Sequence, residues 1–306
     1  MSNNPTLTVS FHGGGGGTSH TNLHSYPKDT KILSEGSSDP SLKTAELRGF
    51  LLGASKSDAT DLYVVNSDTK NSQILRYEAK GDGTYHNGKV WATDHLHHPF
   101  DAVWGPEGNL YVSNQDPSTD KAIHITVYSS SGGYIGDFAK GFSVLRGMTW
   151  VGKTLWVADE KGGPNKTGAV IAYSCDSKFT GTPTGDSIAV ADPVHVLYDG
   201  SRYVYIGSES GECVYAYDTT QPITQTLAVV VSSSKSASIK RTSGIAIASA
   251  GGTSYLYVGS RADQAVNQYT LNTTVSPPTT SNPSVVLSKL GDDVEFVGVL
   301  GNDVFN

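Results

Sequence analysis

The sequence has few of the features by which proteins are cross-linked, anchored or bound to polyanions. Its 306 residues include two cysteines, Cys175 and Cys213, which are too few for a disulfide framework. No run of eighteen apolar residues occurs, and this argues against a membrane-spanning helix. The 22 Lys and Arg residues are outnumbered by 29 Asp and Glu and form no basic stripe. We therefore expect neither a nucleic acid nor a membrane as partner.

The chain also lacks the start of a secreted protein and the composition of a helical one. Its first residues show no basic segment followed by an apolar one, so no secretory signal is predicted. We expect a cytoplasmic protein by default, with export by another route left open. Runs rich in Leu, Glu and Lys are scarce, whereas Gly (34) and Tyr (16) are abundant. This balance predicts an all-β protein.

One stretch recurs along the whole chain. The segment HPFDAVWGPEGNLYVSNQD, residues 98–116, has two short apolar strands around a Gly-Pro-Glu-Gly-Asn turn. Related segments begin at Glu46, Val144, Asp192 and Arg241, and a shortened copy begins at Asp292. The six copies align, at steps of 46 to 52 residues, on Gly49, Asp101, Gly147, His195, Gly244 and Phe296. A strand-rich repeat of this length indicates the blades of a β-propeller.

We therefore predict one domain over residues 1–306, a six-bladed β-propeller with four-stranded antiparallel blades. The blades begin near residues 46, 98, 144, 192, 241 and 292. In the second blade the strands are expected at 100–104, 110–113, 123–128 and near 134–138. The last copy is short, and residues 1–45 are expected to complete it. We expect a clasp of two C-terminal and two N-terminal strands, which would remove exposed sheet edges.

The repeated pattern also resembles a known group of proteins. An apolar strand, a Gly turn, Leu-Tyr-Val followed by a polar residue, and a later strand ending in Tyr resemble NHL-type propeller repeats. They are similar as well to gluconolactonase-type hydrolases, strictosidine-synthase-like proteins and peptidyl-amidating lyases. The resemblance covers nearly the whole chain and implies a fold, whereas function depends on the positions at which the copies differ.

The copies differ most where each innermost strand begins, at the mouth of the central channel. Ionisable side chains stand there in five of six copies: Arg48, Asp101, Arg146, His195 and Glu295. They either form ion pairs that plug the channel or make a binding site for a polar ligand. The two arginines would suit a carboxylate or phosphate group.

The resemblance implies a possible metal, but the sequence departs from the expected ligands. Lactonase-type relatives hold a divalent cation through a Glu, two Asn and an Asp from different blades. Here Arg146 stands where an Asn is expected, with Arg48 in the matching place, and a cation is repelled there. The amidating lyases use histidines around zinc, which would leave His195 with Asp101 and Glu295. We therefore expect no metal or cofactor, with Ca²⁺ or Zn²⁺ at Asp101, His195 and Glu295 as the alternative.

A second set of polar residues follows the Leu-Tyr-Val strands, among them Asn66, Asn114, Asp159, Ser208 and Ser260. Such residues at strand ends usually satisfy their own turns, and we expect a structural role. They could also ring one face as sugar pockets. The copies differ too much for equivalent sugar sites, however, and all four Trp lie within residues 91–156.

Three functions follow from these observations. Our first hypothesis is a non-catalytic binding or scaffold propeller that recognises a small polar or anionic ligand, or a protein partner, on the loop face at the channel mouth. The alternative is a divergent metal-dependent hydrolase or lyase. The third is a sugar-binding lectin.

Overall fold

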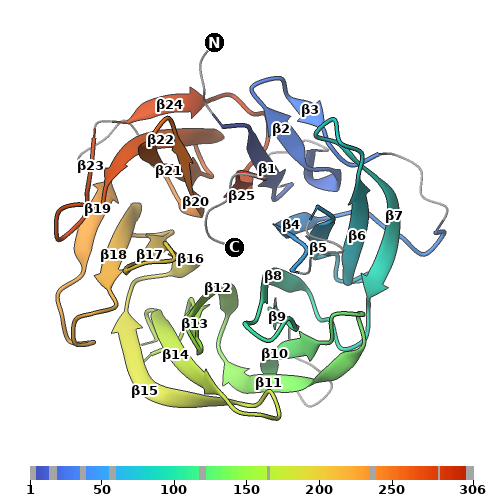
Figure 1. The fold of residues 1–306 in the computed structure, drawn as a ribbon, viewed down its shortest axis with the longest axis horizontal. Coiled ribbons are helices and arrows are strands. Elements are labelled where there is room, and N and C mark those ends of the chain that lie inside the picture. The colour runs from blue at the N-terminus through green and yellow to red at the C-terminus, as the bar shows by residue number, and fades with distance from the viewer. Residues whose placement is uncertain are drawn as a thin grey trace.

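The structure is a computed structural model that describes residues 5–13, 19–34, 39–54, 60–116, 122–163, 166–233, 239–281 and 283–300. Within these residues the chain forms six antiparallel sheets arranged as blades around a central channel (Figure 1). The prediction of an all-β, six-bladed β-propeller is confirmed. No helix among these residues is long and apolar enough to cross a bilayer.

Five blades are each built from strands that follow one another from the channel outward. The first contains β4 (Leu47–Leu52), β5 (Leu62–Asn66), β6 (Gln73–Ala79) and β7 (Tyr85–Ala92). The second contains β8 (Pro99–Trp104), β9 (Leu110–Asn114), β10 (Ile123–Tyr128) and β11 (Tyr134–Phe142). The third contains β12 (Leu145–Val151), β13 (Thr154–Asp159), β14 (Ala169–Cys175) and β15 (Gly181–Ala189). The fourth contains β16 (Pro193–Tyr198), β17 (Tyr203–Ser208), β18 (Cys213–Asp218) and β19 (Ala228–Ser232). The fifth contains β20 (Thr242–Ala250), β21 (Thr253–Ser260), β22 (Ala265–Asn272) and β23 (Thr279–Thr280), and β24 (Ser284–Leu287) also pairs with β22.

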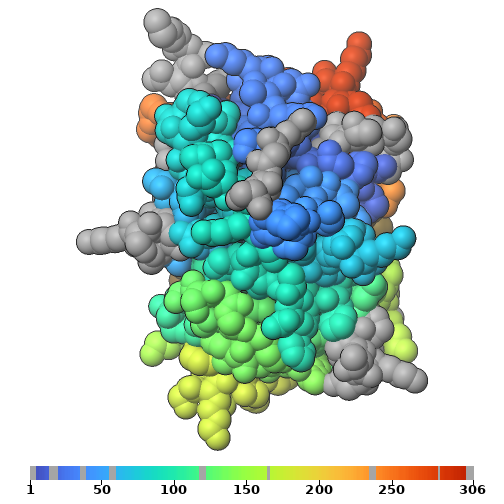
Figure 2. All heavy atoms as spheres, turned by 90° about the vertical axis from the view of Figure 1, so that its right-hand side faces the viewer, coloured from blue at the N-terminus to red at the C-terminus, as the bar shows by residue number. Residues whose placement is uncertain are grey.

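The sixth blade joins the two ends of the chain. Its innermost strand is β25 (Val294–Gly298), and β1 (Leu7–Phe11), β2 (His24–Tyr26) and β3 (Thr30–Lys31) complete it, with a short 3₁₀ helix (Ser19–Thr21) between β1 and β2. Val9 pairs directly with Val297, so β1 takes the second position. The expected clasp of two plus two strands is thus wrong. Among the described residues it is one C-terminal strand with three N-terminal ones. Figure 2 shows the N-terminal segment (blue) lying against the first blade (cyan) at the rim.

The core lies between neighbouring blades. The strands second from the channel are the most deeply placed, and every residue of β5, β9 and β17 is buried. Each blade packs between two others, so these strands carry apolar side chains on both faces, which is why they appear as continuous apolar runs. One cluster joins the first two blades through Tyr63, Val65, Val112 and Tyr128, and equivalent clusters recur around the ring.

Each innermost strand has an irregularity in pairing near its start. In β8 it falls between Pro99 and Asp101, and in β16 between Pro193 and His195. A β-bulge adds a residue there and bends the strand. This allows two adjacent residues, such as Phe100 and Asp101, both to face the channel region.

Glycines of alternate blades make room for those side chains. A Cβ added at Gly49 would lie 2.9 Å from Asp101 Oδ1, and one at Gly147 would lie 2.9 Å from His195 Cδ2. A Cβ at Gly244 would lie 2.6 Å from Phe296 Cα. The aligned position therefore alternates around the ring: glycine in the first, third and fifth blades, and a large side chain in the second, fourth and sixth.

Candidate functional site

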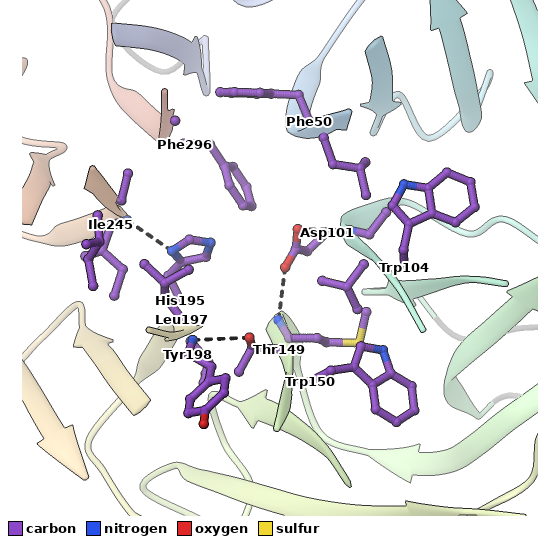
Figure 3. Close-up of a pocket in the computed structure, with 18 of the residues that line it drawn as sticks. Phe50, Asp101, Trp104, Thr149, Trp150, His195, Leu197, Tyr198, Ile245 and Phe296 are labelled. Carbon is purple, nitrogen blue, oxygen red and sulfur yellow. Dashed lines mark hydrogen bonds between the residues drawn. The ribbon is translucent and has the colours of Figure 1, made fainter. Parts of the chain in front are cut away.

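A cavity of about 370 Å³ occupies the channel, between the bulges of the innermost strands and the turns that follow them. All six innermost strands, β4, β8, β12, β16, β20 and β25, contribute to its wall. Figure 3 shows Asp101, His195 and Phe296 projecting toward the middle of this space from three sides. The volume lies within the roughly 300–1,000 Å³ of pockets that enclose small molecules.

Asp101 is the only carboxyl group on the wall of the cavity formed by the described residues. Its Oδ2 accepts a hydrogen bond of 2.9 Å from Met148 N, and its Oδ1 accepts one of 2.9 Å from Ala102 N. Burial nevertheless dominates and raises the pKa of Asp101 to about 7, because the ionised form loses its hydration. The carboxyl group therefore exchanges its proton near neutral pH.

His195 lines the cavity from the fourth blade. Its Nδ1 lies 3.0 Å from Ile245 N, which can only donate, so Nδ1 accepts and the proton of the neutral ring is on Nε2. Burial lowers the pKa of His195 to about 4, and the ring is uncharged at neutral pH. Its edge packs on the Phe296 ring, with the two centroids 5.1 Å apart.

Asp101 and His195 thus have the same structural task at equivalent places. Each accepts a hydrogen bond from a backbone N–H group of the next innermost strand, Met148 for Asp101 and Ile245 for His195. These N–H groups face the channel, where their strand has no neighbouring strand to pair with. Phe296 stands at the third equivalent place and has no acceptor to offer. An unsatisfied buried N–H is costly, so these two side chains stabilise the ring whatever else they do.

An apolar plug closes the cavity at the end where the innermost strands begin. Phe100, Val194 and Phe296 are buried and in contact, with Phe50 packed against them. The rings of Phe100 and Phe296 have centroids 5.1 Å apart. Among the described residues, the cavity extends from this plug toward the turns that follow the innermost strands, at Pro106 and Gly200.

Beyond the plug lies the predicted mouth with its arginines. The guanidinium carbons of Arg48 and Arg146 lie 5.2 and 5.1 Å from the centroid of the Phe100 ring. Neither residue lines the cavity. The plug therefore separates these arginines from Asp101 and His195.

The charges at this mouth are paired with one another. Arg48 Nε donates to Glu46 at 3.0 Å, and Arg146 Nε donates to Glu160 at 2.6 Å. A second group of ion pairs joins Arg241, Arg261, Glu209 and Glu295. Burial and the neighbouring arginines lower the pKa of Arg261 to about 10, which leaves it charged at neutral pH. The four arginines and four glutamates of this balanced network carry equal and opposite formal charge, in two pairs and one group of four, and Lys161 also contacts Glu160 at 3.4 Å.

The five residues predicted for one site therefore fall into two groups. Asp101 and His195 face the cavity, whereas Arg48, Arg146 and Glu295 belong to the ion-paired mouth on the other side of the plug.

The polar residues at the ends of the second strands hold loops in place. Asn66 accepts hydrogen bonds from the backbone of Ala45 and Glu46, Asn114 from His97, and Asp159 from Ser143 and Val144. Each anchors the segment that leads into its own blade's innermost strand. Their role is structural, as expected, but these hydrogen bonds go to the segment that precedes the blade and not to the residues' own turns.

Sequence reasoning did not assign the residues at the open end of the cavity to a site. Trp104, Trp150 and Tyr198 line it, and each lies three residues after the aligned position of its copy. Trp104 Nε1 donates to Leu52 O at 2.8 Å, whereas Trp150 Nε1 has no hydrogen-bond partner among the described residues. Three aromatic residues at one repeat position were the signal that could have identified this end.

The three residues predicted as alternative metal ligands, Asp101, His195 and Glu295, do not form a metal site among the described residues. The described residues contain no group of three or more His, Cys, Asp or Glu side chains placed to hold an ion. Of the three candidate ligands, Glu295 is paired with Arg261 beyond the plug. A Ca²⁺ ion takes six to eight oxygen ligands, and one carboxyl group does not supply them. Zn²⁺ would have Asp101 and His195, which is fewer than the three protein ligands of a catalytic zinc site.

Comparison with known proteins shows the fold. No protein-family model and no curated protein matches this chain. A functionally unknown protein from Desulfotomaculum acetoxidans matches at 11% identity, with a TM-score of 0.59 over 92% of this chain and 80% of that one. A candidate 6-phosphogluconolactonase from Bacteroides uniformis matches at 10% identity and a TM-score of 0.58, over 92% and 82%. The periplasmic gluconolactonase of Pseudomonas aeruginosa matches at 14% identity and a TM-score of 0.58, over 92% and 83%. The chain is a six-bladed β-propeller that resembles gluconolactonase-type proteins at the level of the fold.

Proposed function

We propose that this protein binds a small molecule in the channel cavity, without converting it, and that the ligand enters at the end lined by Trp104, Trp150 and Tyr198. The observation that carries the proposal is the cavity itself, which is closed at one end by Phe100 and Phe296 and walled by all six blades.

The lining of the cavity suits a ligand with an apolar body and one or two polar groups. Most residues of the wall are apolar or aromatic, and among the described residues Asp101, Thr149 and His195 add polar side chains to it. His195 Nε2–H can donate, and each Asp101 oxygen keeps a lone pair beside its backbone bond. Pockets of this kind gain affinity from apolar burial and orientation from a few polar contacts.

The ion-paired mouth is less suited to binding a ligand than the cavity is. An anionic ligand there would have to displace Glu46, Glu160 or Glu209 from arginines that they already neutralise. A buried charge that loses its partner is strongly destabilised. The balanced network therefore favours a structural role for Arg48 and Arg146 over an anion site.

One observation favours a second function, the hydrolysis of a lactone or ester. A carboxyl group with a pKa near 7 and a neutral imidazole line the same cavity. Ionised Asp101 could accept a proton from a water molecule that attacks the carbonyl carbon, and His195 Nε2–H could hydrogen-bond the carbonyl oxygen. The C–O bond would then break, with the proton passing to the leaving alkoxide.

Binding is tested by filling the cavity. Ring-containing fragments, neutral and charged, are screened by ligand-observed NMR, and hits are titrated against wild type and Thr149→Met. Thr149 lines the cavity, so the longer side chain should weaken binding at least about tenfold. Lys153→Met, on the exposed turn of the same hairpin, is the control and should bind as wild type does.

Three outcomes decide between these functions. Hits that bind wild type and Thr149→Met equally well lie outside the channel and contradict the proposal. An absence of saturable hits contradicts it as well. Turnover of lactones or esters that is lost in Asp101→Asn would replace the binding function by hydrolysis.

A further inference from the structure

We propose that the ligand of this cavity is an organic cation, a substituted ammonium group on an apolar body, with the Asp101 carboxylate as its counter-ion. This inference rests on the proposed function of the same cavity and adds the chemical class of the ligand.

The first support is a buried carboxyl group without a cationic partner. The hydrogen bonds of Asp101 come from two backbone N–H groups, Met148 and Ala102. No Lys or Arg is found among the described residues that line the cavity. Buried charges in proteins are normally paired, and here the position of the partner is open cavity.

The charged and titratable groups of the surrounding strands do not take that place. On β4 and β12 they are Arg48 and Arg146, which lie against Phe100 and are paired with Glu46 and Glu160. On β25 it is Glu295, which is paired with Arg261. On β16 they are His195 and Tyr198. On β9 the neighbour is the neutral Ser113, whose Oγ accepts from Asp101 N.

His195 does not serve as the missing cation. Its Nδ1 is occupied as an acceptor by Ile245 N–H, at 3.0 Å. A protonated ring would carry a hydrogen on that nitrogen, directed at the backbone hydrogen, and the contact would become repulsive. The neutral ring is therefore the form that fits, and it leaves the charge of Asp101 uncompensated.

The second support is the aromatic character of the wall. Phe50, Phe296, Trp104, Trp150 and Tyr198 all line the cavity, and Phe296 projects into it (Figure 3). Ring faces attract cations within about 6 Å, most strongly where water is excluded. Phe100, next to Phe296, already contacts two guanidinium groups in this way. An anionic ligand would instead lie beside the Asp101 carboxylate, which would repel it.

The test uses two probes that share a shape and differ in charge. Acetylcholine and its neutral isostere 3,3-dimethylbutyl acetate are titrated into wild-type protein at pH 8 by calorimetry, with Trp fluorescence as a second readout. We expect the cation to bind at least about tenfold more tightly, because it gains a charge-assisted contact with Asp101. Equal or tighter binding of the neutral probe would show that the charge inference is wrong.

Two matched variants then locate the effect. Asp101→Asn keeps the size of the side chain and should reduce the preference for the cation to about onefold, with the affinity for the neutral probe little changed. Asp94→Asn, at an exposed residue in the segment between β7 and β8, should keep the full preference. A preference that survives in Asp101→Asn would place the cation site elsewhere. If Asp101→Asn does not fold, the pair of probes on wild-type protein still decides the inference. If both probes bind only weakly and without saturation, this inference and the proposed function fail together.

Discussion

Asp101 makes a quantitative prediction about the stability of the propeller. In the unfolded chain an Asp ionises near its ordinary pKa of 3.8, whereas burial raises the pKa of the folded group to about 7. Between these values the folded state binds more protons than the unfolded state. The free energy of unfolding contributed by Asp101 is therefore highest in acid and falls as the pH rises from about 4 to 7.

The magnitude follows from the size of the shift. The difference from 3.8 to about 7, at about 1.4 kcal/mol per unit, amounts to roughly 4 kcal/mol over the whole range. Between pH 5 and pH 8 the linkage relation gives a loss of roughly 3 kcal/mol. His195 opposes this trend for the protein as a whole, because burial lowers its pKa to about 4 and its contribution therefore rises with pH between about 4 and 6.5. The contribution of Asp101 is thus isolated only in a difference between two proteins.

The assay is urea unfolding of wild type and Asp101→Asn at pH 5, 6, 7 and 8. The Asn side chain can still accept from Met148 N, so its other costs form an offset that does not depend on pH. We expect the free energy of unfolding of wild type minus that of the variant to fall by roughly 3 kcal/mol from pH 5 to pH 8. Asp94→Asn should give a flat difference. A flat or rising difference for Asp101→Asn would refute the raised pKa and the burial from which it follows.

Three further predictions concern the frame around the cavity. Gly244→Ala would place a Cβ 2.6 Å from a backbone carbon of β25 and should lower the free energy of unfolding by about 1–3 kcal/mol. The control is Gly136→Ala, where an added Cβ has no atom within 4 Å. In the same urea titration its free energy of unfolding should stay within about 0.5 kcal/mol of the wild-type value. Glu295→Gln leaves buried Arg261 with Glu209, at 3.6 Å, as its remaining carboxylate. The cost should therefore stay below the roughly 3–5 kcal/mol of a fully unpaired buried charge, and the double variant with Arg261→Met should restore most of it in thermal melts. His195→Phe removes the acceptor of a backbone N–H and should cost about 1–3 kcal/mol at pH 7. Because burial lowers the pKa of His195 to about 4, wild type should lose this advantage as the pH falls from about 6.5 toward 4, and an unchanged advantage at pH 4.5 would contradict that shift.

Most of the fold could be predicted from the sequence repeat. In the second blade the predicted strands at 100–104, 110–113 and 123–128 correspond closely to β8, β9 and β10. This worked because all the blades bury the same kinds of side chain in the same places, so the pattern recurs despite divergence. The outer strand β11 extends to Phe142, beyond the predicted 134–138. Outer strands are more exposed and have a weaker apolar pattern, which makes their ends hard to predict.

The closure of the ring was predicted in kind but not in detail. The sequence indicated that N-terminal strands complete the last blade, because the final copy is short. Which strand sits next to β25 depends on pairing between Val9 and Val297, residues 288 positions apart. Local patterns of apolar residues do not specify such a partner, and the assignment of β1 to the second position came from the structure.

The sequence by itself determined that this chain is a ring of six similar blades, and it selected the repeat position at which the blades differ. Only the tertiary structure decided what those differences do. Arg48 and Asp101 occupy neighbouring alignment positions, yet Phe100 separates a paired guanidinium from an unpaired carboxyl group. The physical reason is that a bulge in its own strand and a glycine in the preceding innermost strand set the direction of the Asp101 side chain, and that glycine, Gly49, lies about fifty residues earlier in the chain.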